Sequence, residues 1–452
     1  MSMSEVKITA PLAEGVYRKV TLRLIPFLFV CYTFAFLDRI NIGVGKLEMV
    51  KDLGLNDLIY STGAGIFFLG YVLMEIPSNL MLARVGVRKT FSRILILWGL
   101  AAAGTAFVVL PWQLYSVRFL LGLFEAGLYP GVIFYLTRWY PAERRAKVIA
   151  IFTCATGIAG LIGGPLSGLL MTSFDGAAGL HGWQWMFIVE GLPTCLIGVA
   201  AFFYLDDGPA EASWLSGPEK TLVLKNLNVD SDDTAYGAHS FAAALADYRV
   251  YLLALIWFTQ ICGVFVIGFW LPTIIKSFGI DSPLHVGLLS AIPYFCSWIA
   301  LILLGRSSDA RNERAWHCGL AMVAGAAGLV AAGMITSSLP LSLLFLSIAT
   351  SGILACNPIL WAIATDYLSG RAAAGAIAVV NTIGLLGGYV SPMIMGWAKT
   401  LTGNLAAGLY IIAAILLVGA LVSIVFTPAM LRGRRLSGGA SSGSPFDAVV
   451  SP

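Results

Sequence analysis

Twelve apolar runs, each about 20 residues long, recur along the 452-residue chain between short polar links. Such a run is long enough to cross the hydrocarbon core of a bilayer as an α-helix, the form in which one segment satisfies its own backbone hydrogen bonds in lipid. Only 12% of the residues are charged, against about 25% in soluble domains. We therefore predict an all-α polytopic membrane protein with twelve transmembrane helices, at approximately 22–43, 58–81, 91–110, 113–137, 146–172, 184–205, 250–275, 285–305, 315–336, 341–365, 373–396 and 404–428.

Lys and Arg are distributed unevenly between the two sides of this predicted bundle. Of the 28 basic residues, 22 fall in segments that lie on one side, and two more, Arg39 and Arg118, lie inside apolar runs. The other side carries four: Lys46, Lys51, Lys276 and Lys399. The positive-inside rule then predicts that both termini are cytoplasmic. Because the basic excess follows topology, we expect no nucleic-acid partner.

The longest polar break, 206–249, divides the chain into two predicted six-helix bundles, 22–205 and 250–428. We interpret this break as a cytoplasmic linker, with a short amphipathic candidate at PEKTLVLKNL. The flanking segments are predicted to be a cytoplasmic N-terminal stretch, 1–21, and a disordered cytoplasmic tail, 429–452, which is basic and then Gly/Ser-rich.

The two halves share a weak internal repeat. An offset of 227 residues matches identical residues in corresponding places of the two halves: Arg84 with Arg311, Arg144 with Arg371, Gly157 with Gly384, Gly160 with Gly387 and Pro165 with Pro392. Repeated halves with a midplane site between them are typical of secondary transporters, so we expect two pseudo-symmetric bundles.

Ionisable residues stand inside two of the apolar runs. Arg118 and Glu125 are seven residues apart, two helical turns, so they share a helix face with Gly122 between them. The run 22–43 contains Asp38 and Arg39. A charge at the centre of a membrane helix costs about 2.5–3.5 kcal/mol, so we expect these four groups to converge on a shared wet chamber between the bundles.

Motifs across nearly the whole chain resemble those of the major facilitator superfamily, and within it the anion:cation symporter family. They are YTFAFLDRINIG, GYVLMEIPSNL, RFLLGLFEAGLYPG, RWYPAERRAK, FWLPTIIKSFG, GRSSDARNER and LSGRAAAGAIAVVNTIGLLGGYVSP. The resemblance implies a secondary transporter of the bacterial inner membrane that takes up a small organic carboxylate with protons by alternating access. We expect it to act as a monomer.

The resemblance also implies roles for the buried charges. Arg39 would grip the substrate carboxylate with two parallel hydrogen bonds. Asp38 and Glu125 would carry the coupled protons, and Arg118 would compete with the proton for Glu125. The alternative for Arg39 is a salt bridge to Asp38 or another acid, and the alternative for Arg118 is a structural pair with Glu125.

Five further residues are expected, by resemblance, to line the substrate pocket: Tyr32, Tyr71, Gln260, Trp361 and Asn381. For each of them ordinary helix packing is nearly as good an interpretation. Leu385 stands where many family members carry a second Asn, which weakly favours a substrate less polar than a sugar acid. Aromatic acids and small hydroxy acids both remain open.

Charged residues at the predicted cytoplasmic helix ends are interpreted as gate latches: Arg84, Arg88, Glu143, Arg144, Asp309 and Arg311. A purely topological, solvated role is the alternative. Ala83 departs from the superfamily pattern, in which the loop carries an Asp, and this puts the gating contacts of the first half in doubt.

Other function classes find little support in the residues. The four His have no metal-ligand spacing, and no phosphate-binding GxxxxGK[ST] is present, so we expect no metal, cofactor or ATP. No nucleophile–base–orienter set indicates an enzyme. An anion exchanger remains open, because GLIGGPLSG resembles an antiporter motif. So does a membrane sensor, although the linker and tail leave little room for a signalling domain.

Overall fold

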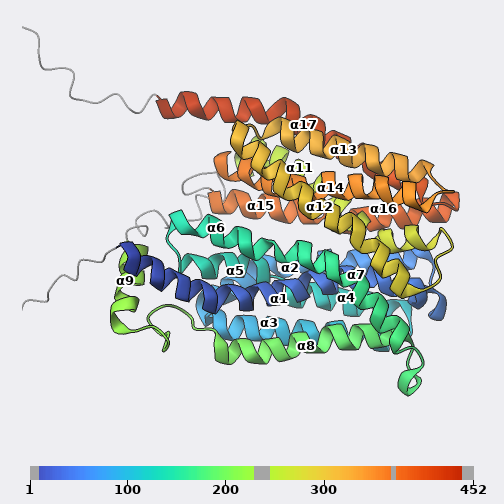
Figure 1. Ribbon diagram of the computed structural model, residues 1–452, viewed down its shortest axis with the longest axis horizontal. Helices are drawn as coiled ribbons and strands as arrows, with labels where there is room; N and C mark the ends of the chain where they lie inside the picture. Colours follow the sequence, from blue (N-terminus) through green and yellow to red (C-terminus); the bar gives the residue numbers. More distant parts are fainter. Residues whose placement is uncertain (1–9, 229–244, 368–372, 440–452) are drawn as a thin grey trace, which may run out of the picture.

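The computed structural model describes residues 10–228, 245–367 and 373–439 as a bundle of long helices (Figure 1). Its elements are α1 (Ala10–Asp52), α2 (Asp57–Val85), α3 (Val87–Gly104), η1 (Thr105–Phe107), α4 (Pro111–Glu125), α5 (Leu128–Thr137), α6 (Ala142–Thr153), α7 (Ala155–Ser173), η2 (Ala177–Gly179), α8 (Gly182–Tyr204), α9 (Gly217–Asn228), α11 (Tyr248–Lys276), α12 (Pro283–Arg311), α13 (Ala315–Met334), α14 (Leu339–Tyr367), α15 (Ala373–Leu385), α16 (Gly387–Thr402) and α17 (Ala406–Gly439).

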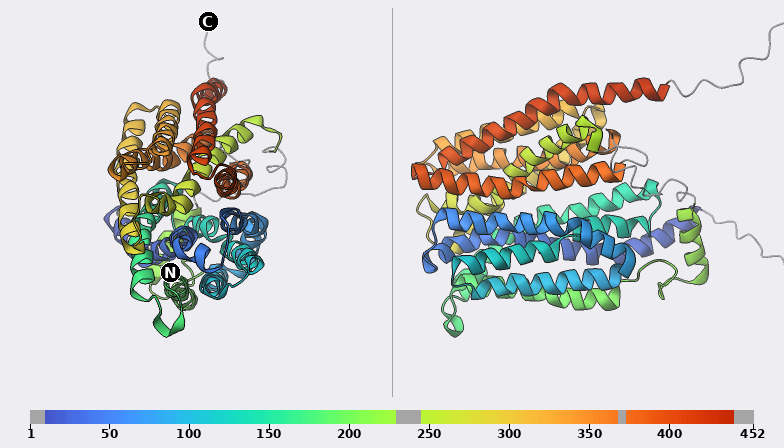
Figure 2. Two further views of the ribbon diagram at one scale, coloured as in Figure 1. Left: turned by 90° about the vertical axis from the view of Figure 1, so that its right-hand side faces the viewer. Right: turned by 180° about the vertical axis from the view of Figure 1, so that it is seen from behind.

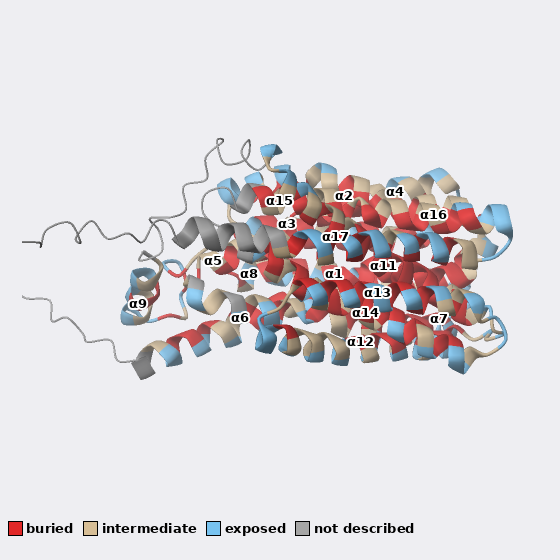
Figure 3. Cartoon of the chain, turned by 90° about the horizontal axis from the view of Figure 1, so that it is seen from above, coloured by how far each residue is buried: buried red, intermediate tan, exposed pale blue. Residues whose placement is uncertain are grey.

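Twelve spans of the described chain are long and apolar enough to cross a membrane, which confirms the predicted all-helical class. Three of the spans are built from two α-helices each, α4 with α5, α6 with α7, and α15 with α16, and a fourth joins α3 to the 3-10 helix η1. These breaks were not predicted, because apolar composition runs through them without change. Buried residues gather in the interior of the bundle and exposed residues at its rim and ends (Figure 3).

The helices form two groups, α1–α8 and α11–α17 (Figure 2). We call the end of the bundle where α1 begins and α17 ends the termini side, and the opposite end the far side. Three helix pairs hold the groups together: α1 packs on α11, α7 packs on α12, and α2 packs on α16. Because α7–α12 and α2–α16 are equivalent pairs from opposite halves, the packing has the two-fold pseudo-symmetry that the repeat indicated. Arg371, one member of that repeat, lies outside the described residues.

Small residues bring the two groups into contact on the far side. A Cβ on Gly164 of α7 would lie 2.8 Å from the Gly287 carbonyl oxygen of α12, and one on Gly65 of α2 would lie 3.0 Å from the Tyr389 carbonyl oxygen of α16. Backbones can approach this closely only where side chains are absent or small. The glycines therefore seal the far side.

Several predicted boundaries differ from the structure. The first span begins near residue 13, within a helix that starts at Ala10. In this added stretch the Tyr17 hydroxyl accepts a hydrogen bond from Asn226 of α9 at 3.2 Å. The candidate PEKTLVLKNL is helical, as α9, and its Glu219 pairs with Lys19 of α1. The tail was expected to be disordered from residue 429, which is wrong for its first part, since α17 continues to Gly439. Residues 440–452 lie outside the described residues.

Candidate functional site

Two glycines place the charged face of α4 against its neighbours. A Cβ on Gly122 would collide with the backbone carbonyl of Phe67, so α2 and α4 cross at this residue in near contact. Gly127 adopts a left-handed φ of +93°, where it separates α4 from α5 and packs on Ser78. Residues with a Cβ rarely adopt this conformation. As a result α4 ends at Glu125, whose side chain is held in the centre of the first group.

Arg39 of α1 and Glu125 of α4 form a buried ion pair. The Glu125 Oε1 atom accepts from Nε of Arg39 at 2.6 Å and lies 2.5 Å from its Nη2. The guanidinium also lies over the rings of Tyr71 and Phe67, at 5.0 and 5.5 Å from the centroids. The second carboxyl oxygen, Oε2, is buried and has no hydrogen-bond partner among the described residues. Only one of the two carboxyl oxygens of Glu125 therefore takes part in the ion pair.

Asp38 and Arg118 lie behind this pair, inside the first group. Arg118 donates to the backbone carbonyl of Asp38 at 3.4 Å, and its Nε and Nη2 atoms are buried without a hydrogen-bond partner in the described chain. The structure brings all four predicted charges together, but with different pairing. Arg118 and Glu125 make no salt bridge among the described residues, and Arg39 pairs with Glu125 and not with Asp38.

A cavity of about 750 Å³, part of it open to solvent, lies between the two groups of helices. Of the four charged residues, Arg39 alone lines it, so the expectation that all four share one chamber is wrong for the other three. Successive residues on a helix point about 100° apart, which turns Asp38 away from the wall that Arg39 faces.

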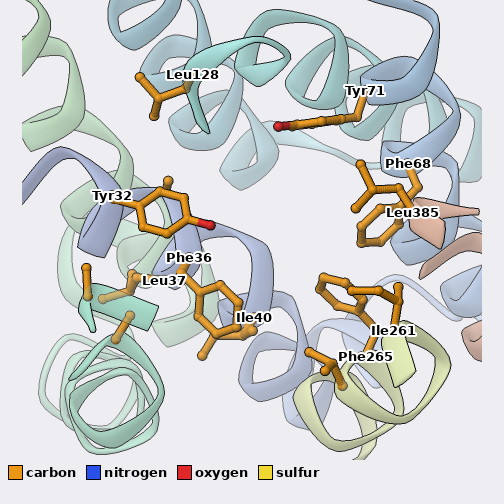
Figure 4. Packing of buried hydrophobic residues seen from close by; sticks show 14 of the residues in the cluster. Tyr32, Phe36, Leu37, Ile40, Phe68, Tyr71, Leu128, Ile261, Phe265 and Leu385 are labelled. Atoms are coloured by element: carbon orange, nitrogen blue, oxygen red, sulfur yellow. The ribbon is translucent and has the colours of Figure 1, made fainter. Parts of the chain in front are cut away.

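Four of the five predicted pocket residues line this cavity, and Gln260 does not. Figure 4 shows the rings of Tyr32 and Tyr71, from α1 and α2, with their hydroxyl groups directed into the same central space. Trp361 and Asn381 contribute from α14 and α15. Gln260 is fully buried and donates to the Ile353 carbonyl at 3.0 Å, which is a packing contact between α11 and α14.

Sequence reasoning missed several members of the site. Asn357, Thr153, Thr156 and Tyr129 add polar groups to the cavity wall. Their apolar neighbours in sequence concealed them.

Two more buried acids were missed, although each stands visibly inside an apolar run. Glu75 of α2 accepts from Asn381 of α15 at 2.6 Å, which links the two groups beside the cavity. Glu190 of α8 accepts from Ser167 at 2.7 Å and from Asn41 at 2.9 Å. Ionisable groups therefore lie inside more than the two predicted apolar runs. Glu75 and Glu190 are visible in the sequence and were the signal for the other two runs.

Lysines close the far side of the cavity. Lys46, which is buried, and Lys399 of α16 both pair with Asp57 of α2, at 2.7 and 2.9 Å. Lys276 donates to the Leu47 carbonyl at 2.7 Å, and Lys46 lies over the ring of Trp270. We call Lys46, Asp57 and Lys399 the lysine latch. Lys399–Asp57 and Lys276–Leu47 join the two groups of helices directly.

The predicted gate residues lie on the termini side, where the interactions found stay within one group. Arg144 pairs with Glu14 at 2.7 Å, Asp309 pairs with Arg314, and the Arg88 backbone N–H donates to Asp207 at 2.9 Å. Asp207 thus binds the backbone at the α2–α3 junction, next to the loop in which Ala83 stands where the superfamily pattern has an Asp. The side chains of Arg84, Glu143 and Arg311 are exposed. Their role as gate latches stays a prediction.

Comparison with protein families finds the Major Facilitator Superfamily model over residues 28–392. A protein of Agrobacterium vitis described as a putative tartrate transporter is 44% identical over 93% of this chain and 96% of its own length. A quinolone resistance transporter of Acinetobacter baumannii is 40% identical, over 91% and 95%. The putative metabolite transport protein NicT of Pseudomonas putida is 38% identical, over 93% and 96%.

Among solved structures, the crystal structure of a D-xylose–proton symporter superposes with a TM-score of 0.71. It covers 91% of this chain and 98% of its own, at 16% sequence identity. At that identity the likeness concerns the fold alone.

Proposed function

Because the chain belongs to the major facilitator superfamily, we propose that it is a proton-coupled symporter that takes up a small organic carboxylate anion by alternating access. Its relatives are named as transporters, among them tartrate and metabolite transporters, which supports organic-anion transport for this bacterial-type multi-pass membrane protein. We place it in the inner membrane as a monomer with both termini cytoplasmic. The cavity is then closed to the outside by the lysine latch.

The Arg39–Glu125 pair is the observation that carries this proposal. Arg39 is a permanent cation in the cavity wall, and its guanidinium is already occupied by an acid from within the protein. An incoming carboxylate must compete with Glu125 for the same N–H groups. A proton on Glu125 removes its charge, weakens its hold on Arg39 and leaves the guanidinium free for the substrate. Proton and anion therefore favour each other's binding.

The cycle follows from this competition. Outside, where the pH is lower, Glu125 takes up a proton and the anion binds Arg39 between the rings of Tyr32 and Tyr71. The loaded carrier closes, the lysine latch re-forms behind the anion, and the cavity opens to the cytoplasm. There Glu125 loses its proton, returns to Arg39 and displaces the anion. Tartrate is the substrate to test first, since a hydroxy acid would suit Asn357 and Asn381 as hydrogen-bond partners.

A second candidate is an organic-anion exchanger that carries one anion outward as another enters. The segment GLIGGPLSG, which resembles an antiporter motif, is the observation that favours it. Both candidates use the same cavity and differ in whether the proton drives net movement.

The test is uptake of radiolabelled tartrate into proteoliposomes that contain the purified protein. We expect accumulation above the external concentration when the outside is acidic, and its collapse when a protonophore is added. Uptake that needs tartrate inside and ignores the pH gradient would establish exchange instead. If tartrate does not bind, a thermal-shift panel of aromatic and hydroxy acids at two pH values identifies the anion before the transport assay is repeated.

A further inference from the structure

Glu190 is a buried acid that the proposed cycle does not use. It lies on α8 with 1% of its surface exposed, and its two carboxyl oxygens accept from the Ser167 hydroxyl and the Asn41 amide. No Lys, Arg or His forms a salt bridge with it among the described residues. A fully charged carboxylate is costly in such surroundings, so a proton is the ligand that this site most readily takes.

Asn41 connects Glu190 to Asp38. Its Nδ2 atom lies 2.9 Å from Oε2 of Glu190 and 3.3 Å from Oδ1 of Asp38, so one amide group serves both acids. Two carboxyl groups that share a donor at this range influence each other's ionisation, and a proton on one favours the charged form of the other. Asn41 thereby joins a residue expected to carry protons to one with no assigned role.

The Asn41 amide can serve this pair in either charge state. Its Oδ1 atom is buried and has no hydrogen-bond partner among the described residues. An amide carries donors on one side and an acceptor on the other. When an acid binds a proton, half a turn of the amide presents Oδ1 to the new O–H group. This unpartnered oxygen is an observation independent of the two acids, and it points to a proton.

A second, smaller cavity touches the same amide. It lies between the two groups of helices, and its walls include Asn41 and Gly164 from the first group and Gly268 and Ser290 from the second. Asn41 therefore stands between the buried acids and a space at the interface that moves during alternating access.

The remaining neighbours of the two acids bear on their charge. Arg118 and Glu125 face Asp38 from α4, and Cys195 faces it from α8. Ser167 of α7 is a neutral donor to Glu190. Arg118 is thus the cation nearest to this cluster, and it cannot balance two ionised acids.

We propose that Glu190 is a positioning residue for proton coupling, which shares one proton with Asp38 through Asn41 and so sets the pH at which the carrier loads. This rests on the proposed symport. One O–H bond forms on the pair when a proton arrives from water, and the same bond breaks when the proton leaves to water on the other side. No other covalent bond changes.

The experiment measures tartrate uptake into proteoliposomes against external pH for the wild type and E190Q. The Gln side chain in Glu190→Gln cannot bind a proton, and it has no charge that would repel an ionised Asp38. Asp38 then takes up its proton only in more acidic solution. We expect the midpoint of the pH profile to move about one unit to lower pH. Tartrate counterflow at one fixed pH should stay within about twofold of wild type, because the exchange of bound anion needs no net proton movement.

Two variants sharpen the readout. Thr194→Val is the matched control, because Thr194 is also fully buried on α8, one turn from Glu190, and is not hydrogen-bonded to the pair. Its profile should match wild type. Ser167→Ala removes a donor that favours the charged form of Glu190, so Glu190 should bind its proton more readily. The midpoint should therefore move to higher pH, opposite to the shift in E190Q, and by a smaller amount.

An E190Q profile that coincides with wild type, with counterflow intact, overturns the proposal and leaves Glu190 as a neutral packing group. If E190Q does not reach the membrane, the S167A variant decides instead, and a pH profile that coincides with wild type overturns the proposal. Failure of the proposed symport itself looks different, because the wild type would then show no accumulation driven by the pH gradient.

Discussion

Arg39 and Glu125 are 86 residues apart in sequence and are joined by a buried ion pair at the wall of the central cavity. Arg39 is the one cation among the described residues that faces the cavity, and the pair places it under the control of an acid that is itself sealed from water. Substrate binding and proton binding then act on the same two side chains. This relationship is the basis of the first two predictions.

Replacing Arg39 with Lys should weaken anion binding while the positive charge is kept. Lysine cannot reproduce the two parallel N–H groups of a guanidinium, and a hydrogen bond to a charged group is worth about 1.5–3 kcal/mol. We expect tartrate affinity to fall by about tenfold to a hundredfold in calorimetric titrations. Arg306→Lys is the control, since Arg306 is exposed and does not line the cavity. Equal affinity in R39K and wild type would remove Arg39 from the carboxylate site.

Glu125→Gln should separate binding from proton coupling. A neutral amide cannot hold Arg39 as the carboxylate does, so the anion should bind at all pH values and tartrate counterflow should continue. Accumulation driven by an acidic exterior should be lost, and the pH dependence of binding between pH 5 and 8 should flatten. Proteoliposome uptake and thermal-shift titrations measure the two effects. Robust accumulation by E125Q would exclude Glu125 as the coupling residue.

Gly122→Ala should destabilise the first group of helices. The new Cβ would overlap the Phe67 carbonyl, which is backbone and cannot move aside, so α2 and α4 must separate. We expect a loss of about 1–3 kcal/mol, seen as a lower midpoint of thermal unfolding in detergent. Gly305→Ala on α12 is the matched control, because nothing lies within 4 Å of its added Cβ. Equal midpoints for the two variants would contradict the close crossing.

Lys399→Gln should open the far side more often. It removes the ion pair at 2.9 Å between α16 and Asp57, which keeps its bond to Lys46. Partly exposed pairs contribute about 0.2–1 kcal/mol, so the open population should rise by up to about fivefold. The measurement is the rate at which an impermeant maleimide labels S61C, on a background without native cysteines, because Ser61 is fully buried against Gly396. Lys51→Gln, at an exposed position, should leave the rate unchanged.

The contact of α9 with α1 should weaken in acid. The Ser216 N–H and the Lys19 ammonium hold the pKa of Glu219 below its usual range. Because the pKa of Glu219 is lower in the folded state than in the unfolded state, the ionised Glu219 stabilises the contact at any pH above the unfolded-state pKa. This stabilisation is lost as the pH falls through the folded-state pKa. Distances between spin labels on α1 and α9 should therefore broaden in acidic solution. Glu219→Gln should show the broad distribution already at pH 7, and a distribution independent of pH in the wild type would refute the contact.

The sequence by itself determined the twelve spans and their helical state, because hydrophobic length is a local property and lipid allows one segment few other structures. It also determined that Asp38, Arg39, Arg118 and Glu125 need partners, since their burial is costly wherever they lie. Only the tertiary structure decided which partners these are. The crossing at Gly122 brings α4 to α1 and selects Glu125 for Arg39. Helix rotation leaves Arg39 at the cavity and turns Asp38 toward Asn41 and Glu190, and no local pattern encodes that choice, because it depends on how distant helices pack.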